Sequence, residues 1–234
     1  MVPVANAITQ DPVHPPLGVG ALVDGRYRIE RMLGSGGMAH VWLATHLGLG
    51  RAVALKIVHA PRPEVCARVR AEALSMARLT HPHVVGVFDA GALPDGSPFL
   101  ALELVDGPTL SAELERGPLA PAHAGALLRQ VAAALGAAHE AGIVHRDVKP
   151  SNILLREGTP KLTDFGIAAA LEGAGERLTS HGALIGTPAY MAPELLTGAR
   201  PDARVDVWSL AVTLYECLTN EMPFEAESLP GLMQ

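Results

Sequence analysis

The feature that most limits what this chain can fold into is the polar segment His145–Asn152. The triplet Asp164-Phe165-Gly166 begins twelve residues after the end of this segment. Within the segment, Asp147 can accept the proton of a hydroxyl and Lys149 can neutralise a phosphoryl group in transit. The amide of Asn152 and the carboxylate that heads the triplet offer oxygen ligands of the kind that Mg²⁺ prefers. A polar surface loop followed by a turn is the alternative, but it gives no reason for these groups at these positions. The spacing therefore indicates loops and short strands that carry phosphoryl-transfer chemistry.

A glycine-rich turn near the start of the chain could bring backbone N–H groups close to phosphate oxygens. The turn Gly34-Ser35-Gly36-Gly37 lies between Tyr27–Leu33 and His40–Thr45, which we expect to be strands. Glycine has no Cβ, so a ligand can approach such a backbone closely. An ordinary hairpin turn would look similar. Strand-like residues follow the turn and no Gly-Lys-Ser/Thr ending is present, so neither a dinucleotide-binding motif nor a P-loop fits.

Lys56 is the one charged residue of the expected strand Ala52–Val58. It could be an edge-strand lysine that faces water. The next segment, Pro63–Leu79, has helical spacing, and Glu72 lies on or beside its apolar face, where a carboxylate needs a partner. We therefore expect Glu72 to hold Lys56 over a phosphate. In a chain this poor in lysine, each remaining one is a candidate for a role that arginine cannot fill; the other two are Lys149 and Lys161.

The pattern of strands and helices predicts an α+β, bilobal chain whose lobes meet near Val105. The first half is rich in strands and the second in helices, with residues 1–25 as a disordered leader. Residues 166–193 are expected to be irregular. Besides the segments already named, we expect strands at Val84–Phe88, Phe99–Leu104, Ile153–Leu155 and Lys161–Thr163, and helices at Leu110–Arg116, Pro121–Ala141 and Val205–Leu218.

Composition excludes several classes of protein. The net charge of −6 and the pI near 5.9 argue against nucleic acid as a bulk partner, because phosphate backbones need a basic face. Only two cysteines occur, which favours reduced thiols in a cytoplasmic setting. No signal peptide and no membrane span is visible. The chain could still be the cytosolic part of a longer, membrane-anchored protein, but no membrane contact is expected from this segment.

The ordered motifs resemble those of the eukaryotic-type protein kinase family, and within it the bacterial Ser/Thr kinases. The resemblance runs from about Tyr27 to Phe224. In chain order the matching motifs are the glycine loop Gly34–Val41, the Val-Ala-Leu-Lys that ends at Lys56, the helix residue Glu72, His-Arg-Asp at 145–147, Asp-Phe-Gly at 164–166, Met-Ala-Pro-Glu at 191–194 and Asp-Val-Trp-Ser at 206–209.

The resemblance implies a protein-kinase-like fold, with an N-lobe over residues 26–105 and a helical C-lobe over 106–234. It implies that ATP and Mg²⁺ are bound and that Ser/Thr hydroxyls of proteins are phosphorylated, with autophosphorylation by a possible dimer. The catalytic residues would be Asp147, Lys149, Lys56, Glu72 and Thr187, and the metal ligands Asn152 and Asp164. The nucleotide would contact Leu33, Gly34, Ser35, Gly36, Gly37, Met38, Ala39, Val41, Ala54, Lys56, Leu102, Glu103, Val105, Asp106 and Leu154.

The resemblance also extends to regulation and to the contact between the lobes. Arg146 would receive a phosphate on the activation segment, at Thr179 or Ser180. A column of His145, Phe165, Met76 and Val87 would join the lobes in the active state, although Met76 and Val87 are also ordinary core residues.

The chain departs from the family pattern at three points. Ala39 stands where the family has a third loop glycine, which leaves the backbone N–H in place. Glu194 is usually paired in the family with an arginine near the end of the domain, and the sequence reaches Gln234 before any such arginine. For the same reason we expect the last helices of the C-lobe to be missing, which would expose an apolar face of the helix at Val205–Leu218. A pseudokinase scaffold and a small-molecule phosphotransferase are the alternatives, but no catalytic residue is lost and the peptide-docking motifs are present.

Overall fold

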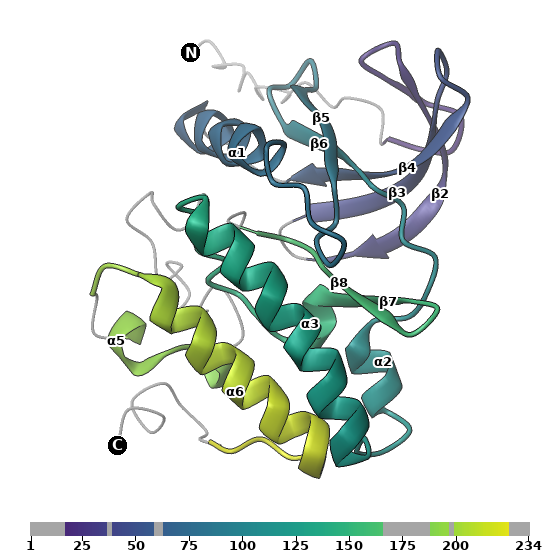
Figure 1. The fold of residues 1–234 in the computed structure, drawn as a ribbon. Helices are drawn as coiled ribbons and strands as arrows, with labels where there is room; N and C mark the ends of the chain where they lie inside the picture. The colour runs from purple at the N-terminus through teal and green to yellow at the C-terminus, as the bar shows by residue number, and fades with distance from the viewer. Residues whose placement is uncertain (1–16, 37–38, 59–62, 166–187, 197–198, 225–234) are drawn as a thin grey trace, which may run out of the picture.

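The structure is a computed structural model that describes residues 17–36, 39–58, 63–165, 188–196 and 199–224. A twisted sheet with one helix beside it forms one half of the molecule, and a group of helices forms the other (Figure 1). A small two-stranded hairpin lies between the two halves, and the predicted α+β architecture is confirmed.

The six-stranded sheet is antiparallel throughout, in the order β1-β2-β3-β4-β6-β5. Apolar residues cover both of its faces. One cluster includes Ile29, Trp42 and Phe99, and another includes Val58 and Leu102, against which helix α1 (Pro63–Met76) packs. The strands are β1 (Leu22–Val23), β2 (Tyr27–Ser35), β3 (Ala39–His46), β4 (Arg51–Val58), β5 (Val87–Ala92) and β6 (Pro98–Leu102).

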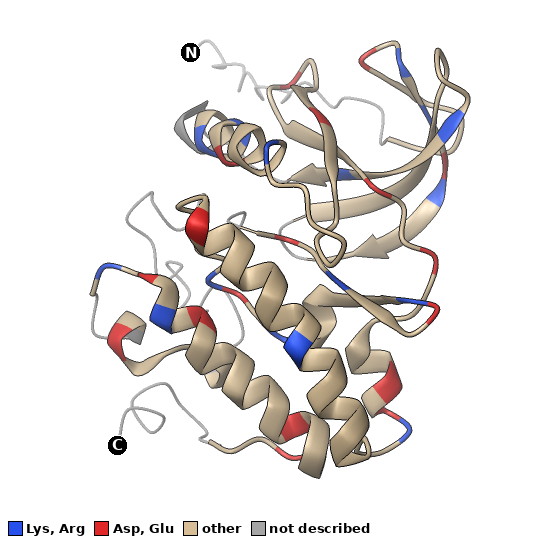
Figure 2. Ribbon diagram, viewed as in Figure 1, with Lys and Arg blue, Asp and Glu red and all other residues tan. Residues whose placement is uncertain are grey.

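The helical half is built around the long helices α3 (Pro121–Glu140) and α6 (Ala203–Thr219), which pack against each other. Alanines and leucines on α3 allow the helices to pack closely, and few charges interrupt either helix (Figure 2). Asp202 caps the N-terminus of α6 by accepting a hydrogen bond from the backbone N–H of Arg204. The remaining elements are α2 (Leu110–Leu114), α5 (Pro193–Leu196), the hairpin β7 (Ile153–Arg156) and β8 (Thr159–Leu162), and single 3₁₀ turns at Pro150–Asn152 and Pro188–Tyr190.

Most predicted elements are confirmed, and the shifted boundaries have local causes. Val84 and Val85 do not belong to β5, because the backbone N–H of Val85 donates to the carbonyl of Leu162 in β8 (2.9 Å). The strand begins only at Val87, where pairing with β6 starts. The prediction that residues 1–25 form a disordered leader is wrong for residues 17–25, since β1 pairs with β2 and Val23 is buried. Residues 1–16 lie outside the described part of the chain.

Two further predictions concern the last helices. The face of α6 that carries Val207, Tyr215 and Leu218 is exposed, as expected for an uncovered apolar face. Glu194 is only half-buried. The pKa of Arg204 is raised chiefly by its hydrogen bonds with Asp202, and the charge of Glu194 contributes to the same shift. The Glu194 charge is therefore not left without an interaction, whereas the expectation about the arginine near the end of the domain stays a prediction. Among the helices that the structure describes, none is long and apolar enough to cross a membrane.

Candidate active site

Asp206 in the first turn of α6 holds the start of the catalytic loop. Its carboxylate is completely buried. It accepts hydrogen bonds from the backbone N–H groups of His145 (2.8 Å) and Arg146 (2.7 Å), and it lies 2.7 Å from Nε2 of His139 on α3. A buried carboxylate with three partners is well satisfied. Two helices thus fix the position from which the loop begins.

His145 is fixed in one tautomer by its neighbours. Its Nε2 lies 2.8 Å from the carbonyl of Thr163 and must donate there, while Nδ1 accepts from the backbone N–H of Asp147 at 3.2 Å. Burial lowers the pKa of His145 below its ordinary value, although Asp206 and the carbonyl of Thr163 oppose the shift. The imidazole is therefore a neutral link between the loop and the strand that leads to Asp164.

Asp147, Lys149 and Asn152 meet as predicted. Lys149 Nζ lies 2.9 Å and 2.8 Å from the two carboxylate oxygens of Asp147. The amide nitrogen of Asn152 donates to the carbonyl of Asp147 (2.7 Å) and to its carboxylate (2.9 Å). The side-chain amide thereby closes the loop on itself and orients the carboxylate. Asp147 and Lys149 stay partly exposed, so a substrate can reach them.

Lys56 forms its ion pair with Asp164, at 2.7 Å between Nζ and Oδ1. Burial raises the pKa of Asp164, but the Lys56 ammonium, with a smaller contribution from the Thr163 hydroxyl, lowers it more, so the net pKa is below the ordinary value. The backbone of Asp164 is left-handed (φ 68°), and so is that of Arg146 (φ 68°). Both residues that flank the site are held in a conformation that L-residues rarely adopt, which is common where function fixes the backbone.

The predicted pairing of Lys56 with Glu72 is wrong in this structure, since no ion pair joins these two described residues. Lys56 is buried and its charge is already balanced by Asp164. Glu72 is half-buried and instead lines a cavity of about 320 Å³, together with Arg78 of the same segment and Arg146 of the catalytic loop. There the half-buried carboxylate shares the cavity with two guanidinium groups, so it needs no lysine.

The residues predicted to hold the adenine come together. Ala54, Val105 and Leu154 pack against a cluster that contains Ala39 and Leu102. Val41 pairs with Lys56 and Ala54 with Leu102 across neighbouring strands. Asp106 is exposed at the end of the connection between the halves.

The glycine loop is described in part. Gly34 and Ser35 end β2, and the backbone N–H of Gly36 donates to the carbonyl of Ala39 (3.0 Å). Leu33, the residue before them, is exposed. Gly37, Met38 and Thr187 lie outside the described residues, as do Thr179 and Ser180.

The oxygen donors at the site fit Mg²⁺ held together with a nucleotide. The described residues contain no group of three His, Cys, Asp or Glu side chains that could hold a metal alone. Mg²⁺ in phosphoryl-transfer sites usually takes one or two protein oxygens plus substrate phosphates and water. Asp164 supplies a carboxylate and Asn152 an amide oxygen, because the amide nitrogen of Asn152 is already used toward Asp147. The backbone N–H of Thr163 donates to the carbonyl of Asn152 (2.9 Å), which links the two segments.

Known proteins resemble this chain over most of its length. The family model of the protein kinase domain matches residues 27–232. The chain belongs to the protein kinase family.

Among its relatives are serine/threonine-protein kinases of mycobacteria. PknL of Mycobacterium tuberculosis is 42% identical over 96% of this chain, and PknD of the same species is 44% identical over 89%. The chain spans only 56% of the length of PknL and 32% of that of PknD. The crystal structure of the Mycobacterium tuberculosis PknI kinase domain has a TM-score of 0.72 and 32% identity, covering 89% of this chain and 79% of that one.

The hydrophobic column expected of this kinase family is present at its centre. The rings of His145 and Phe165 lie 4.4 Å apart, and Phe165 belongs to the same cluster as Met76, with Val87 packed against it. A cavity of about 20 Å³ remains between Phe165, Met76, Val87 and Leu102, which is room for about one water molecule.

A clamp between the kinase halves was not predicted. Glu103 was expected to act through its backbone, yet its carboxylate accepts from Lys161 (3.0 Å) and Arg156 (2.8 Å) of the hairpin β7–β8. Burial raises the pKa of Glu103, but Lys161, the Gly86 N–H and Arg156 lower it more. With this pair, all three lysines of the chain form ion pairs. The scarcity of lysine was therefore the feature of the sequence that could have pointed to the Lys161–Glu103 contact.

Gly107, two residues after Val105, is required by packing in the same kinase region. A Cβ at Gly107 would lie 1.9 Å from the carbonyl oxygen of Leu155, so no other residue fits.

A separate cavity of about 1010 Å³ lies on the other side of the N-terminal sheet and is lined by residues such as Trp42 and Leu93. None of the predicted site residues lines it, so its size does not mark the active site.

Proposed function

We propose that this chain is a catalytic domain that transfers the γ-phosphoryl group of Mg-ATP to Ser and Thr hydroxyls of proteins. The observation that carries the proposal is the Asp147 carboxylate, held by Lys149 and Asn152 on a loop that Asp206 anchors. A carboxylate fixed in this way can orient a hydroxyl and take its proton.

In the reaction, the oxygen of the Ser or Thr hydroxyl forms a bond to the γ-phosphorus. The bond between that phosphorus and the β–γ bridging oxygen breaks, ADP leaves, and the hydroxyl proton passes to Asp147. Lys149 balances the charge on the phosphoryl group in transit, and Lys56 with Asp164 lies where the other phosphates would bind. Mg²⁺, held by Asn152 and Asp164, would neutralise phosphate charge when bound. Positioning and charge neutralisation supply the rate.

The adenine-side cluster supports the proposal that the chain binds a nucleotide. The carbonyl of Glu103 and the N–H of Val105 make no hydrogen bond with any other described residue. These are the groups that the edge of an adenine would use. Ala54 and Leu154 would cover its two faces. We also propose that Thr187 is a catalytic residue and that the glycine loop contacts the nucleotide, as the resemblance implies.

Labelled phosphate from Mg-ATP tests the function in the full-length protein. We expect transfer to a protein substrate to yield phosphoserine and phosphothreonine after acid hydrolysis, and Lys56→Met to abolish it. Arg51→Met, an exposed arginine on the same strand, is the matched control and should leave transfer intact. Full transfer by the Lys56→Met protein would contradict the proposal.

We propose that phosphorylation at Thr179 or Ser180 regulates the enzyme through Arg146. The Nε atom of Arg146 is buried without a hydrogen-bond partner among the described residues, and Arg78 lines the same cavity. Two guanidinium groups around one cavity suit a phosphate. Phosphopeptide mapping after incubation with Mg-ATP should find the modification at one of these residues. Full activity with neither residue modified would contradict this control.

Dimerisation for autophosphorylation and a cytoplasmic location, alone or as part of a membrane-anchored protein, are further proposals. Lys and Arg are scattered among Asp and Glu over both halves (Figure 2), which supports protein rather than nucleic-acid substrates. Sedimentation of the full-length protein at increasing concentration would test the dimer.

A further inference from the structure

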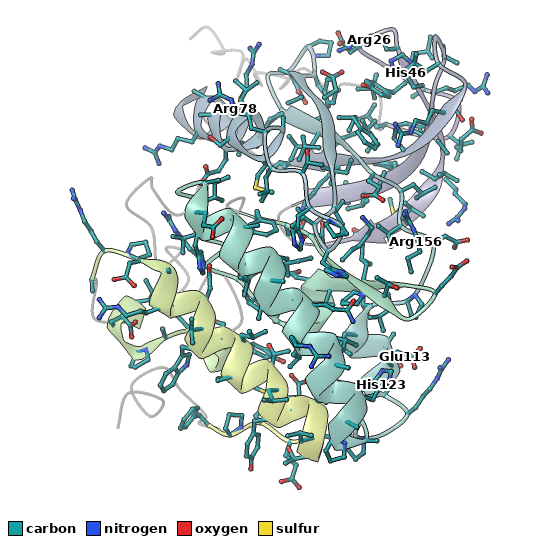
Figure 3. The ribbon with its side chains drawn as sticks, viewed as in Figure 1. Arg26, His46, Arg78, Glu113, His123 and Arg156 are labelled. Atoms are coloured by element: carbon teal, nitrogen blue, oxygen red, sulfur yellow. The ribbon has the colours of Figure 1, made fainter. Side chains whose placement is uncertain are left out.

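The chain segment that connects the two halves is held from one side by a single arginine. Arg156, the last residue of β7, donates through Nη1 to the carboxylate of Glu103 (2.8 Å) and through Nη2 to the backbone carbonyl of Leu104 (2.6 Å). Figure 3 shows Arg156 at the junction between the sheet and the hairpin β7–β8. Its side chain is 39% exposed, so it reaches the connection from the rim rather than from the core.

The two contacts fix the orientation of one peptide unit. Glu103 is also held by Lys161 at its other carboxylate oxygen, and its backbone N–H donates to Gly86 (2.8 Å). Once Glu103 is fixed, the bond from Arg156 to the Leu104 carbonyl leaves that peptide unit little freedom to rotate. A planar fork with donors in fixed directions can hold two acceptors at once, which a lysine cannot do.

This peptide unit joins the Leu104 carbonyl to the N–H of Val105, which is one of the two groups proposed to read the adenine. The carbonyl of Glu103 and the N–H of Val105 are both without a hydrogen bond to any described residue. In a planar trans peptide the carbonyl and the N–H point in opposite directions, and in extended backbone successive carbonyls also alternate in direction. The Leu104 carbonyl is held on the side of β7, so the groups of Glu103 and Val105 are left for a ligand on the opposite side.

We propose that Arg156 is a positioning residue for the adenine: it holds the Leu104 carbonyl so that the Glu103 carbonyl and the Val105 N–H face the nucleotide base. The inference rests on the proposed ATP-dependent function and adds a residue that touches neither ATP nor the protein substrate. Its effect should be confined to the base, because the phosphate-side residues Lys56 and Asp164 make no contact with it.

The test compares ligands that contain the base with one that lacks it. Dissociation constants of adenosine, Mg-ATP and Mg-tripolyphosphate are measured by calorimetry on the full-length wild-type protein and on Arg156→Met, which keeps the length and loses the fork. Arg156→Lys keeps one donor. Arg116→Met is the matched control, because Arg116 forms a two-contact pair with Glu113 far from the connection.

We expect Arg156→Met to raise the dissociation constants of adenosine and Mg-ATP by about tenfold and to leave that of Mg-tripolyphosphate unchanged. Arg156→Lys should lie between wild type and Arg156→Met, and Arg116→Met should match wild type. The KM for ATP should rise with the dissociation constant while kcat stays constant, as expected when only binding of the base is lost.

Two results would overturn the inference. One is an unchanged dissociation constant of adenosine in Arg156→Met. The other is an equal loss for adenosine and Mg-tripolyphosphate, which would show that Arg156 only supports the structure. A wild-type protein that binds neither adenosine nor Mg-ATP would instead overturn the proposed function.

Discussion

The catalytic loop and the Lys56 region differ in how their charges are satisfied. In the loop, Asp147 is held by residues two and five positions later, and its anchor Asp206 comes from a packed helix. Lys56 does not pair with Glu72 of the next helix, as was predicted, but with Asp164. A geometry set by local spacing can be predicted from the sequence, whereas a contact between separately packed elements depends on how those elements are arranged.

The largest effect is expected from removing the anchor of the loop. Asp206→Ala leaves two backbone N–H groups and His139 without their buried acceptor, which should lower the free energy of unfolding by about 3–5 kcal/mol. Urea unfolding of the full-length protein measures the change. Asp202→Ala, which removes an exposed cap at the start of the same helix, should cost much less. Equal losses in the two variants would show that Asp206 is no special anchor.

A smaller effect is expected from loosening the loop itself. Asn152→Ala removes the two bonds that close the loop on Asp147 and also one proposed metal ligand. We expect kcat to fall by about a hundredfold, because the base is no longer held in place. Steady-state kinetics at several Mg²⁺ concentrations measures it. If added Mg²⁺ restores wild-type kcat, Asn152 acts as a ligand alone and not as a brace for Asp147.

Acid should lower the stability of the folded protein, because His145, which links the catalytic loop to the strand that leads to Asp164, is buried in its neutral form. Burial lowers the pKa of His145, and burial also lowers that of His81, each from an ordinary 6.5. Below pH 6.5 the unfolded chain therefore binds protons that the folded chain refuses, and stability falls as the pH falls. The loss should reach at most about 1.4 kcal/mol per pH unit for each group. Thermal unfolding between pH 7.5 and about 5.5 measures it, and a slope that survives unchanged in His145→Gln would exclude His145 as a source.

The smallest effect on stability is expected at Glu72. Because Glu72 makes no ion pair with Lys56 here, Glu72→Gln should change the free energy of unfolding by no more than about 0.5 kcal/mol. Urea unfolding and phosphoryl transfer are measured on the same preparation. A large loss of transfer at unchanged stability would show that Glu72 meets Lys56 in a second arrangement, and a large loss of stability would contradict the structure.

The sequence was informative where function depends on local spacing. The grouping of Asp147, Lys149 and Asn152 and most helices were predicted because short loops and periodicity determine them. The adenine-side cluster was predicted only from the resemblance to the protein kinase family. The start of β5 was misplaced because Val84 and Val85 are both buried, Val84 in the helical cluster and Val85 against the sheet, and a strand pattern cannot distinguish such burial from pairing with β6. The side chains of Glu103 and Arg156 meet across 53 positions, and no local pattern reports such a contact. The scarcity of lysine was the one signal that pointed toward Lys161.

The most direct test of the account is the turnover of Asp147→Asn, measured together with its affinity for Mg-ATP in the full-length protein. The substitution keeps the shape of the side chain and its contact with Asn152, but removes the charge that pairs with Lys149 and takes the proton. The account predicts a fall in phosphoryl transfer of about a thousandfold, within the range for loss of a general base, with nucleotide binding retained. Undiminished transfer by Asp147→Asn would contradict the account.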